Sequence, residues 1–142
     1  AVDVALFPNR CEGGLNLVAM EALACGTPTV LSRNTGHRDL IDAVEGATGS
    51  YPIATQRDVV VRGEATRRDA WGESDVGEVA DALEAVYYGR ADAKQRGRFA
   101  SQRIRTRFSW LACAADFVGV LRRRGLLVPR LAATAAAAAA AL

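Results

Sequence analysis

Two glutamates are the residues of this sequence whose types and spacing could do chemistry. In residues 10–28, RCEGGLNLVAMEALACGTP, Glu12 and Glu21 enclose a run of apolar residues and glycines. An unpaired buried carboxylate costs on the order of several kcal/mol or has a raised pKa, so each glutamate needs a partner. A ribose diol is a suitable partner, because one carboxylate accepts two hydroxyl hydrogen bonds at once.

The place of Glu21 on its predicted helix allows two interpretations. Four residues spaced i, i+3, i+4 and i+7 share one helix face, which we expect to pack on a sheet. They are Leu17, Met20, Glu21 and Ala24. Glu21 either points along the sheet edge into a cleft, where a ligand satisfies it, or is an ordinary surface glutamate on a slightly rotated helix. The spacing alone leaves both open.

The segment EGGLN, residues 12–16, is expected to link the carboxyl end of a strand to the N-terminus of a helix. In open α/β sheets ligands bind at this position. Gly13 and Gly14 allow close approach to the backbone, and free N–H groups at the positive end of the helix dipole favour a phosphate. Such glycines are also common without a ligand, so the loop alone is a weak signal.

The elements that must position these residues alternate between strand and helix. Apolar runs bounded by proline, glycine or polar residues predict them. We expect a buried strand over residues 2–8, a helix over 17–25 with Asn16 as its N-cap, a buried strand over 28–32 and a short helix over 37–44. This βαβα order is typical of a parallel sheet. The predicted fold class is therefore α/β, a Rossmann-like half-sheet followed by C-terminal helices.

The second half of the chain is predicted to be mainly helical. Residues 46–72 are expected to form a loop with one or two short strands, 59–62 being a candidate. The remaining predicted helices cover residues 75–88, 91–107 and 110–124.

The first of these three helices has clear signals at both ends. Asp75 and Glu78 match a capping box, Glu73 and Ser74 resemble further capping residues, and Gly89 ends the helix. Its apolar positions follow helical spacing and should form the packed face. They are Val76, Val79, Ala80, Leu83, Val86 and Tyr87.

Composition and charge indicate one globular domain. The chain has 142 residues, which is long enough to form one hydrophobic core. Half of its residues, 50%, are hydrophobic, which is typical of a globular protein. The formal net charge of +2 is too small to imply a nucleic-acid partner.

Two arginine-rich stretches are expected to be solvated helix faces, although contact with anionic lipid or nucleic acid is an alternative. They comprise Arg96, Arg98, Arg103, Arg105 and Arg107, and residues 122–124.

The cysteines and the single histidine complete the candidates. Three cysteines without CxxC spacing, and no signal peptide, favour reduced thiols in a cytoplasmic protein. They are Cys11, Cys25 and Cys113. No HxxxH, CxxC or DxD pattern occurs, so we expect no metal site.

Thr35, Gly36 and His37 are expected in the loop after the second strand, where they could lie at the edge of a pocket. For His37, a role in packing or helix initiation is the alternative to ligand contact.

Both ends of the chain differ from its middle. The chain starts with alanine inside an apolar run, and we expect a fragment whose upstream part is missing. The tail LAATAAAAAAAL, residues 131–142, is low in complexity and shorter than the roughly 20 residues that cross a bilayer. We therefore expect a domain over residues 1–125, an alanine-rich tail over 126–142, and no transmembrane segment.

The stretch EGGLNLVAMEALACGTPTVLS resembles the signature of the retaining family 4 glycosyltransferases of GT-B fold, E-G-F-G-L-x-x-x-E-A-M-A-C-G-x-P-V-V. The resemblance continues beyond the signature, over roughly residues 1–121. NTGHRDLI matches the family's next glycine loop, WGESDVGEVADALEAVYYG its following helix, and RIRTRFSW the start of its final helix.

The resemblance implies roles for individual residues. Glu12 matches the first family glutamate, which contacts donor-sugar hydroxyls and supports the reacting centre. Glu21 matches the second, which binds the nucleotide ribose. The backbone between them would hold the sugar and the distal phosphate, through Gly13, Gly14, Leu15 and Asn16. This chain has one residue more between the glutamates than the usual pattern, and Arg10 or Asn16 could share the work of Glu12.

The resemblance also implies what the chain would do. The intact protein would transfer a hexosyl group from a nucleotide-diphosphate sugar to an acceptor hydroxyl, with retention and without a metal or other cofactor. This part would bind the donor, and alone it would be inactive, because the acceptor-side N-terminal domain and the diphosphate-binding cations lie upstream. The alternative is a non-catalytic α/β module that binds nucleotide or another protein.

Overall fold

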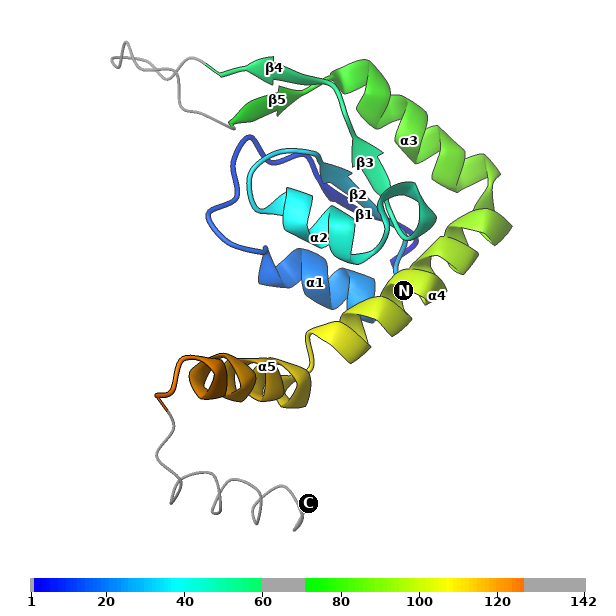
Figure 1. The fold of residues 1–142 in the computed structure, drawn as a ribbon. Coiled ribbons are helices and arrows are strands. Elements are labelled where there is room, and N and C mark those ends of the chain that lie inside the picture. Colours follow the sequence, from blue (N-terminus) through cyan, green and yellow to red (C-terminus); the bar gives the residue numbers. More distant parts are fainter. Residues whose placement is uncertain (1, 60–70, 127–142) are drawn as a thin grey trace. The chain divides into compact units, whose positions relative to one another are not determined.

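The computed structural model describes residues 2–59 and 71–126 (Figure 1). The chain divides into two compact units, the first ending at Arg105 and the second beginning at Thr106. The first contains a parallel sheet with helices on it, and the second contains one described helix.

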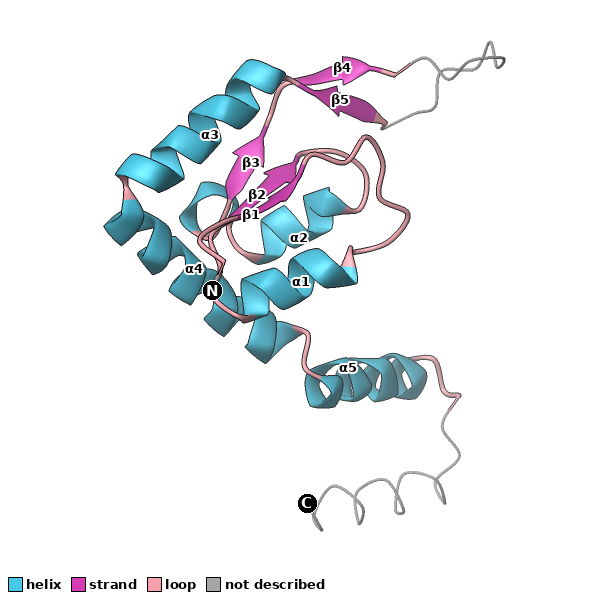
Figure 2. Cartoon of the chain, turned by 180° about the vertical axis from the view of Figure 1, so that it is seen from behind, coloured by secondary structure: helices cyan, strands magenta, loops and turns pink. Residues whose placement is uncertain are grey.

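The first unit is built on a three-stranded parallel sheet in the order β1–β2–β3. The strands are β1 (Ala5–Phe7), β2 (Thr29–Ser32) and β3 (Tyr51–Ile53). Helix α1 (Leu17–Ala24) connects the first pair and α2 (His37–Ala43) the second, followed by a short 3-10 turn, η1 (Gly46–Thr48). Two successive crossovers in the same direction place both helices on one face of the sheet, as Figures 1 and 2 show. The predicted α/β, Rossmann-like architecture is confirmed.

The other face of the sheet is covered by α3 (Val76–Tyr88). Val30 and Ile53 from the sheet pack with Val86 of α3 in one buried cluster, and Val79 and Leu83 extend it. Leu31, next to Val30, points to the opposite face, where α1 and α2 lie. The sheet therefore buries both of its faces at its centre, and all four residues of β2 are buried.

Strand β1 departs from the prediction of a buried strand. It is shorter than the expected range, 2–8, and Leu6 keeps 38% of its surface exposed. The reason is its position, because β1 is the edge strand of the described sheet and pairs only with β2. An apolar run of this length cannot distinguish a central strand from an edge strand.

Residues 46–72 hold two complete short strands, in keeping with the one or two predicted, but neither lies at the candidate position 59–62. They include β3 of the parallel sheet, although Pro52 stands in its middle. Strand β4 (Gln56–Asp58) also begins here and pairs antiparallel with β5 (Gly72–Ser74). The candidate strand at 59–62 is not formed at Val59, and its other residues lie outside the described ones.

The predicted capping box of α3 is half right. Asp75 is the N-cap and accepts a hydrogen bond from the Glu78 backbone N–H at 3.1 Å. The Glu78 carboxylate does not reach back to Asp75. It accepts from the backbone N–H groups of Ala54 and Thr55, each at 2.8 Å, and so joins α3 to the turn after β3. Glu73 and Ser74 belong to β5 and do not cap the helix.

Only part of the predicted apolar face of α3 is packed. Val79, Leu83 and Val86 face the sheet, whereas the side chains of Val76 and Tyr87 are largely exposed. The helix thus presents a narrower stripe than the full set of apolar positions predicts. Gly89 ends it as expected.

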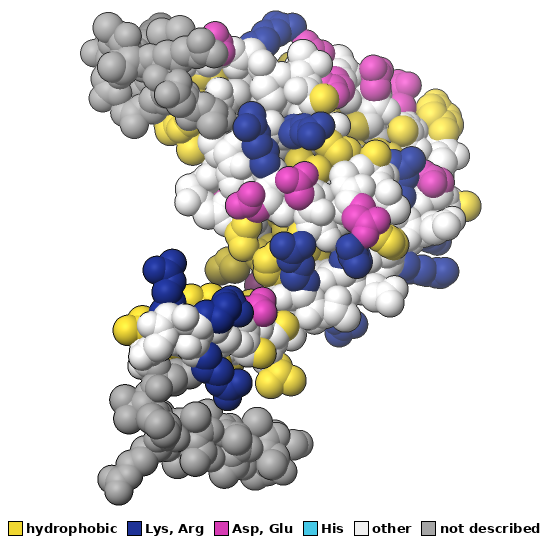
Figure 3. Space-filling view, viewed as in Figure 1, with side chains coloured by type: hydrophobic (Ala, Val, Ile, Leu, Met, Phe, Trp, Pro, Cys, Tyr) yellow, Lys and Arg dark blue, Asp and Glu magenta, His cyan; other side chains and the backbone are white. Residues whose placement is uncertain are grey.

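The long helix α4 (Arg90–Arg107) has a small-residue buried face and a charged exterior. The buried positions are Ala93, Gly97, Ala100 and Ile104. Arg96 pairs with Asp92 at 2.7 Å and donates to the Ala47 carbonyl, and Arg103 pairs with Glu45. Figure 3 shows basic and acidic side chains interspersed over this unit. These two arginines hold α4 to the segment after α2.

The described part of the second unit is α5 (Trp110–Arg123). Ser109 caps it by accepting from the Ala112 N–H at 3.2 Å. Arg122 and Arg123 occupy its last turn, where cations favour the helix dipole, as predicted. The alanine-rich tail lies outside the described residues. Within residues 2–59 and 71–126, no helix has both the length and the apolarity needed to cross a membrane.

Candidate functional site

The loops after β1 and β2 meet at the carboxyl edge of the sheet. The Glu12 backbone N–H donates to Thr35 Oγ1 at 2.7 Å, and the Glu12 carbonyl accepts from the Gly36 N–H at 3.2 Å. A Cβ atom on Gly36 would lie 1.6 Å from the Gly14 carbonyl oxygen, so only glycine permits this approach. The structure therefore brings together the predicted residues of the two loops.

A buried asparagine holds both loops in place. Asn34 is 1% exposed, and its Nδ2 donates to the Asn9 carbonyl at 2.7 Å and to Gln56 Oε1 at 2.8 Å. The Gly72 carbonyl lies 3.1 Å from the same nitrogen. Asn34 Oδ1 accepts from the Thr35 hydroxyl at 3.0 Å. One amide thus connects the loops after β1 and β2 to the β4–β5 hairpin.

The Glu12 carboxylate is half-buried at the same edge. Its Oε2 accepts from Asn9 Nδ2 at 3.2 Å. Arg10, which the sequence offered as a helper, extends elsewhere and pairs with Glu73 of β5 at 2.8 Å. Within the described residues, the Glu12 carboxylate is therefore oriented by an amide and not by a cation.

The glycine loop leaves backbone donors open. Gly13 and Gly14 are exposed, and a Cβ atom built on either would meet nothing within 4 Å. Among the described residues, none accepts a hydrogen bond from the N–H groups of Gly13, Gly14 or Leu15. Asn16 then starts α1 in a left-handed conformation, with φ of 57°, and caps the Ala19 N–H at 3.0 Å. Open N–H groups before a helix N-terminus are suited to bind an anion.

His37 is buried beneath this loop. The ring is 0% exposed, its Nε2 lies 2.9 Å from Asn16 Nδ2, and its Nδ1 lies 2.9 Å from Ser32 Oγ. Burial lowers the pKa of His37 below its ordinary value of 6.5, against the opposing effects of the Glu12 charge and of Ser32. Both ring nitrogens have partners inside the protein, which favours the packing role that the sequence left open for His37 over ligand contact.

Glu21 lies apart from this network, on the exposed side of α1. The prediction that Leu17, Met20, Glu21 and Ala24 form the packed face is wrong: Leu17 is 73% exposed, and Ala19 and Leu23 are the buried residues. The physical reason is that this short helix is apolar on nearly every side, so its periodicity does not identify the buried face. Glu21 needs no buried partner in this position.

Three residues of the site were missed from the sequence. Asn9, Ser32 and Asn34 make the contacts that join the two loops. Each lies at or just after the carboxyl end of a predicted strand, and polar residues at that place are candidates in any open parallel sheet.

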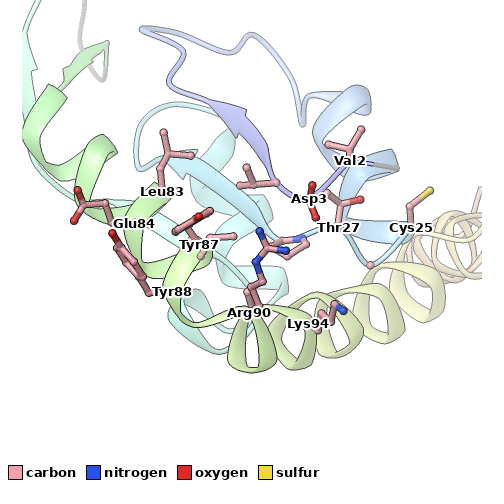
Figure 4. A pocket seen from close by; sticks show the side chains of 15 residues that line it. Val2, Asp3, Cys25, Thr27, Leu83, Glu84, Tyr87, Tyr88, Arg90 and Lys94 are labelled. Carbon is pink, nitrogen blue, oxygen red and sulfur yellow. The ribbon is translucent and has the colours of Figure 1, made fainter.

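A cavity of about 550 Å³ lies at the opposite edge of the sheet. It is lined by residues before β1 and β2 and by the junction of α3 with α4, including Val4, Thr27, Leu83, Tyr87 and Lys94 (Figure 4). Gly26 is also in its lining, whereas residues 12–16, 21 and 35–37 are not. The site residues named from the sequence therefore do not line this cavity.

No set of metal ligands is evident in the described part of the chain, where no three His, Cys, Asp or Glu side chains group together. Cys11, Cys25 and Cys113 are free thiols. The chemistry available at the carboxyl edge is thus hydrogen bonding by backbone N–H groups, amides and the Glu12 carboxylate.

An open parallel sheet with a glycine loop and a helix N-terminus at its carboxyl edge defines a Rossmann-like α/β module. The family model described as "Family 4 Glycosyltransferase in conflict systems" matches residues 1–117, and the chain belongs to this family of glycosyltransferases. The comparison with curated proteins gave no match.

A solved structure supports the same fold. Sucrose-phosphate synthase from Thermosynechococcus elongatus, a GT-B glycosyltransferase, is similar with a TM-score of 0.62 and 23% sequence identity. The alignment covers 86% of this chain and 25% of the synthase. The chain thus spans about a quarter of that protein's length.

Proposed function

We propose that this chain is the donor-binding part of a retaining hexosyltransferase, and that residues 12–16 bind a nucleotide-diphosphate sugar. The observation that carries the proposal is the set of open N–H groups at Gly13, Gly14 and Leu15, directly before the N-terminus of α1. Such a backbone is suited to bind the phosphate groups of a diphosphate. Membership of the glycosyltransferase family supports a sugar nucleotide as the source of that diphosphate.

Each carboxylate has a distinct role in this proposal. Glu12, held by Asn9 at the half-buried base of the loop, would accept hydrogen bonds from donor-sugar hydroxyls. Glu21, on the exposed side of α1, would accept from the ribose diol. Because Glu21 is exposed, it is available to a ligand without the cost of a buried, unpaired charge.

The chemical step would depend on charge stabilisation. Transfer would break the bond between the anomeric carbon and the diphosphate oxygen, and the electron pair would leave with the diphosphate. The acceptor hydroxyl oxygen would form the new bond to the anomeric carbon and give its proton to the departing diphosphate. The loop N–H groups would stabilise that negative charge, and Glu12 the oxocarbenium-like sugar. The upstream part of the whole protein would supply further cations and the acceptor site, so this chain alone should bind the donor without turning it over.

The alternative function, a non-catalytic nucleotide-binding module, makes a different prediction. A module that recognises only the nucleotide gains nothing from the sugar. A donor site with Glu12 at the sugar position should bind the sugar conjugate more tightly than the free nucleotide.

Titration calorimetry of the chain with UDP, GDP and ADP, and with their hexose conjugates, tests the proposal. We expect binding of one base, tighter binding of its hexose conjugate, and the same affinity in EDTA. Binding of the free nucleotide and its conjugate with equal affinity would favour the non-catalytic module. Binding of none of the six compounds would contradict the proposal.

A further inference from the structure

The orientation of the Asn16 amide is fixed by its role at the helix start. Its Oδ1 accepts the Ala19 N–H at 3.0 Å, so the group facing His37 Nε2 at 2.9 Å is the Nδ2 amino group. An amide NH₂ group only donates hydrogen bonds. Nε2 of His37 must therefore be the acceptor, without a proton.

The second ring nitrogen has the complementary role. Ser32 Oγ donates its hydrogen to the Asn9 carbonyl at 2.9 Å, so it receives the hydrogen bond from His37 Nδ1, also at 2.9 Å. The three bonds run in one direction, from Asn16 through His37 and Ser32 to Asn9. Only the neutral Nδ1–H tautomer satisfies all of them.

This series of hydrogen bonds begins at Asn16 and ends at Asn9, which are the two ends of one loop. Asn9 follows β1 and Asn16 precedes α1, and the open backbone of Gly13 and Gly14 lies between them. We propose that neutral His37 is a positioning residue that fastens both ends of the residue 9–16 loop and so presents its N–H groups to an anion. This inference rests on the proposed function for its ligand, but the tautomer and the loop order can be measured without one.

Protonation of the ring would break the chain of bonds at a defined point. An N–H on Nε2 would face the N–H of Asn16, and one of the two must move away. Among the described residues, the charged group that acts on the ring from a neighbouring element is Glu12. Asn16 and Ser32 contribute only neutral groups to the surroundings of the ring. Arg33, Arg38 and Asp39, which are near His37 in the sequence, are exposed. Acid should therefore loosen the loop in the pH range where His37 gains its proton.

Nitrogen-15 NMR tests the tautomer directly, because His37 is the only histidine. At about pH 7.5 we expect a protonated Nδ1 signal and an unprotonated Nε2 signal. The backbone amides of Gly13 and Gly14 should shift on acidification with the same midpoint as the ring. An Nε2–H tautomer, or glycine amides that do not follow the ring, would overturn the inference.

Substitution of Asn16 should change the pKa of His37 in a direction that a purely structural role of Asn16 would not produce. In Asn16→Asp the cap is kept, but the amide donor becomes an acceptor, so the pKa of His37 should rise and the imidazolium should be favoured. Asn16→Ser keeps the cap without touching the ring and is the matched control. A His37 pKa that is equal in the two variants contradicts the assignment.

Ligand affinity supplies the functional readout, with the tightest-binding nucleotide among UDP, GDP and ADP as the probe. Its affinity should fall at least about threefold as the pH is lowered from about 7.5 through the range in which His37 gains its proton, which the NMR titration defines. His37→Gln, which keeps an acceptor for Asn16 but does not titrate, should bind at neutral pH and lose this pH dependence. An unchanged pH profile in His37→Gln overturns the positioning role. If no nucleotide binds, the proposed function fails, and the NMR results alone decide the inference.

Discussion

The side-chain amide of Asn34 and the backbone carbonyl of Asn9 are joined by a 2.7 Å hydrogen bond that crosses from the loop after β2 to the loop after β1. The same amide reaches Gln56 and Gly72 of the β4–β5 hairpin. A single buried side chain thus determines how three chain segments meet at the carboxyl edge of the sheet.

Replacing Asn34 should therefore destabilise the protein strongly. Asn34→Ala removes the donor to Gln56 Oε1 and one of the two donors to the Asn9 carbonyl. An unsatisfied buried polar group costs about 1–3 kcal/mol. We expect a loss of about 2–4 kcal/mol in urea unfolding, against less than about 0.5 kcal/mol for the exposed neighbour in Arg33→Ala. Equal effects of the two substitutions would contradict the role of Asn34.

Glu78 should contribute to stability in a pH-dependent way. Burial tends to raise its pKa, but the N–H groups of Ala54 and Thr55 outweigh burial and hold the pKa below its ordinary value of 4.5. A carboxyl whose pKa is lowered by folding stabilises above its unfolded pKa, and this stability is lost as the pH falls through the folded value.

Glu78→Gln should accordingly cost about 1 kcal/mol at neutral pH and flatten the fall in stability below about pH 4.5. The exposed carboxylate in Asp81→Asn is the control. Urea unfolding at a series of pH values checks both, and an unaltered acid dependence in Glu78→Gln would show that its hydrogen bonds do not matter.

Two glycines at the same edge should respond differently to alanine. In Gly36→Ala the new Cβ would overlap the Gly14 carbonyl, so the loops must separate, with a loss of at least about 2 kcal/mol and of nucleotide binding. In Gly13→Ala the Cβ meets open space, so stability should change by less than about 1 kcal/mol while nucleotide affinity falls. A Gly13→Ala protein with unchanged affinity would indicate that no ligand approaches this backbone.

Glu21 should matter for donor binding and not for folding. Because it is exposed on α1, Glu21→Ala should leave stability unchanged and weaken nucleotide binding at least threefold to tenfold, for a charge-assisted bond of about 1–3 kcal/mol. Glu84→Ala, an exposed glutamate beside the cavity at the opposite edge, should be silent. Calorimetry that finds no difference between Glu21→Ala and the unaltered chain would remove the ribose role.

The local signals in the sequence predicted the elements better than their surroundings. Asn16 and Gly89 mark helix ends that the structure confirms, because caps depend on a few adjacent residues. The burial of Leu6 and the packed face of α1 were predicted wrongly, since both depend on which elements lie beside them. Strand β3 was not predicted, because Pro52 interrupts its pattern.

The sequence predicted where the site lies in the fold, but it did not predict the hydrogen bonds that hold the site together. Glu12 and the glycines fall at the carboxyl edge where an open α/β sheet places its ligand loops. The bonds from Asn16 through His37 to Ser32 cross between segments distant in sequence, and no periodicity encodes them. His37 therefore appeared as a candidate for the ligand pocket, while its observed partners are the residues that hold the loop.

The most direct test of the central claim is a map of backbone amide shifts in the chain as the tightest-binding nucleotide-diphosphate hexose is added. If the carboxyl edge is the donor site, the largest shifts should fall on residues 12–19, with Glu21 next. Shifts centred instead on the cavity at the opposite edge, around Leu83 to Arg90, would contradict the assignment of the donor site.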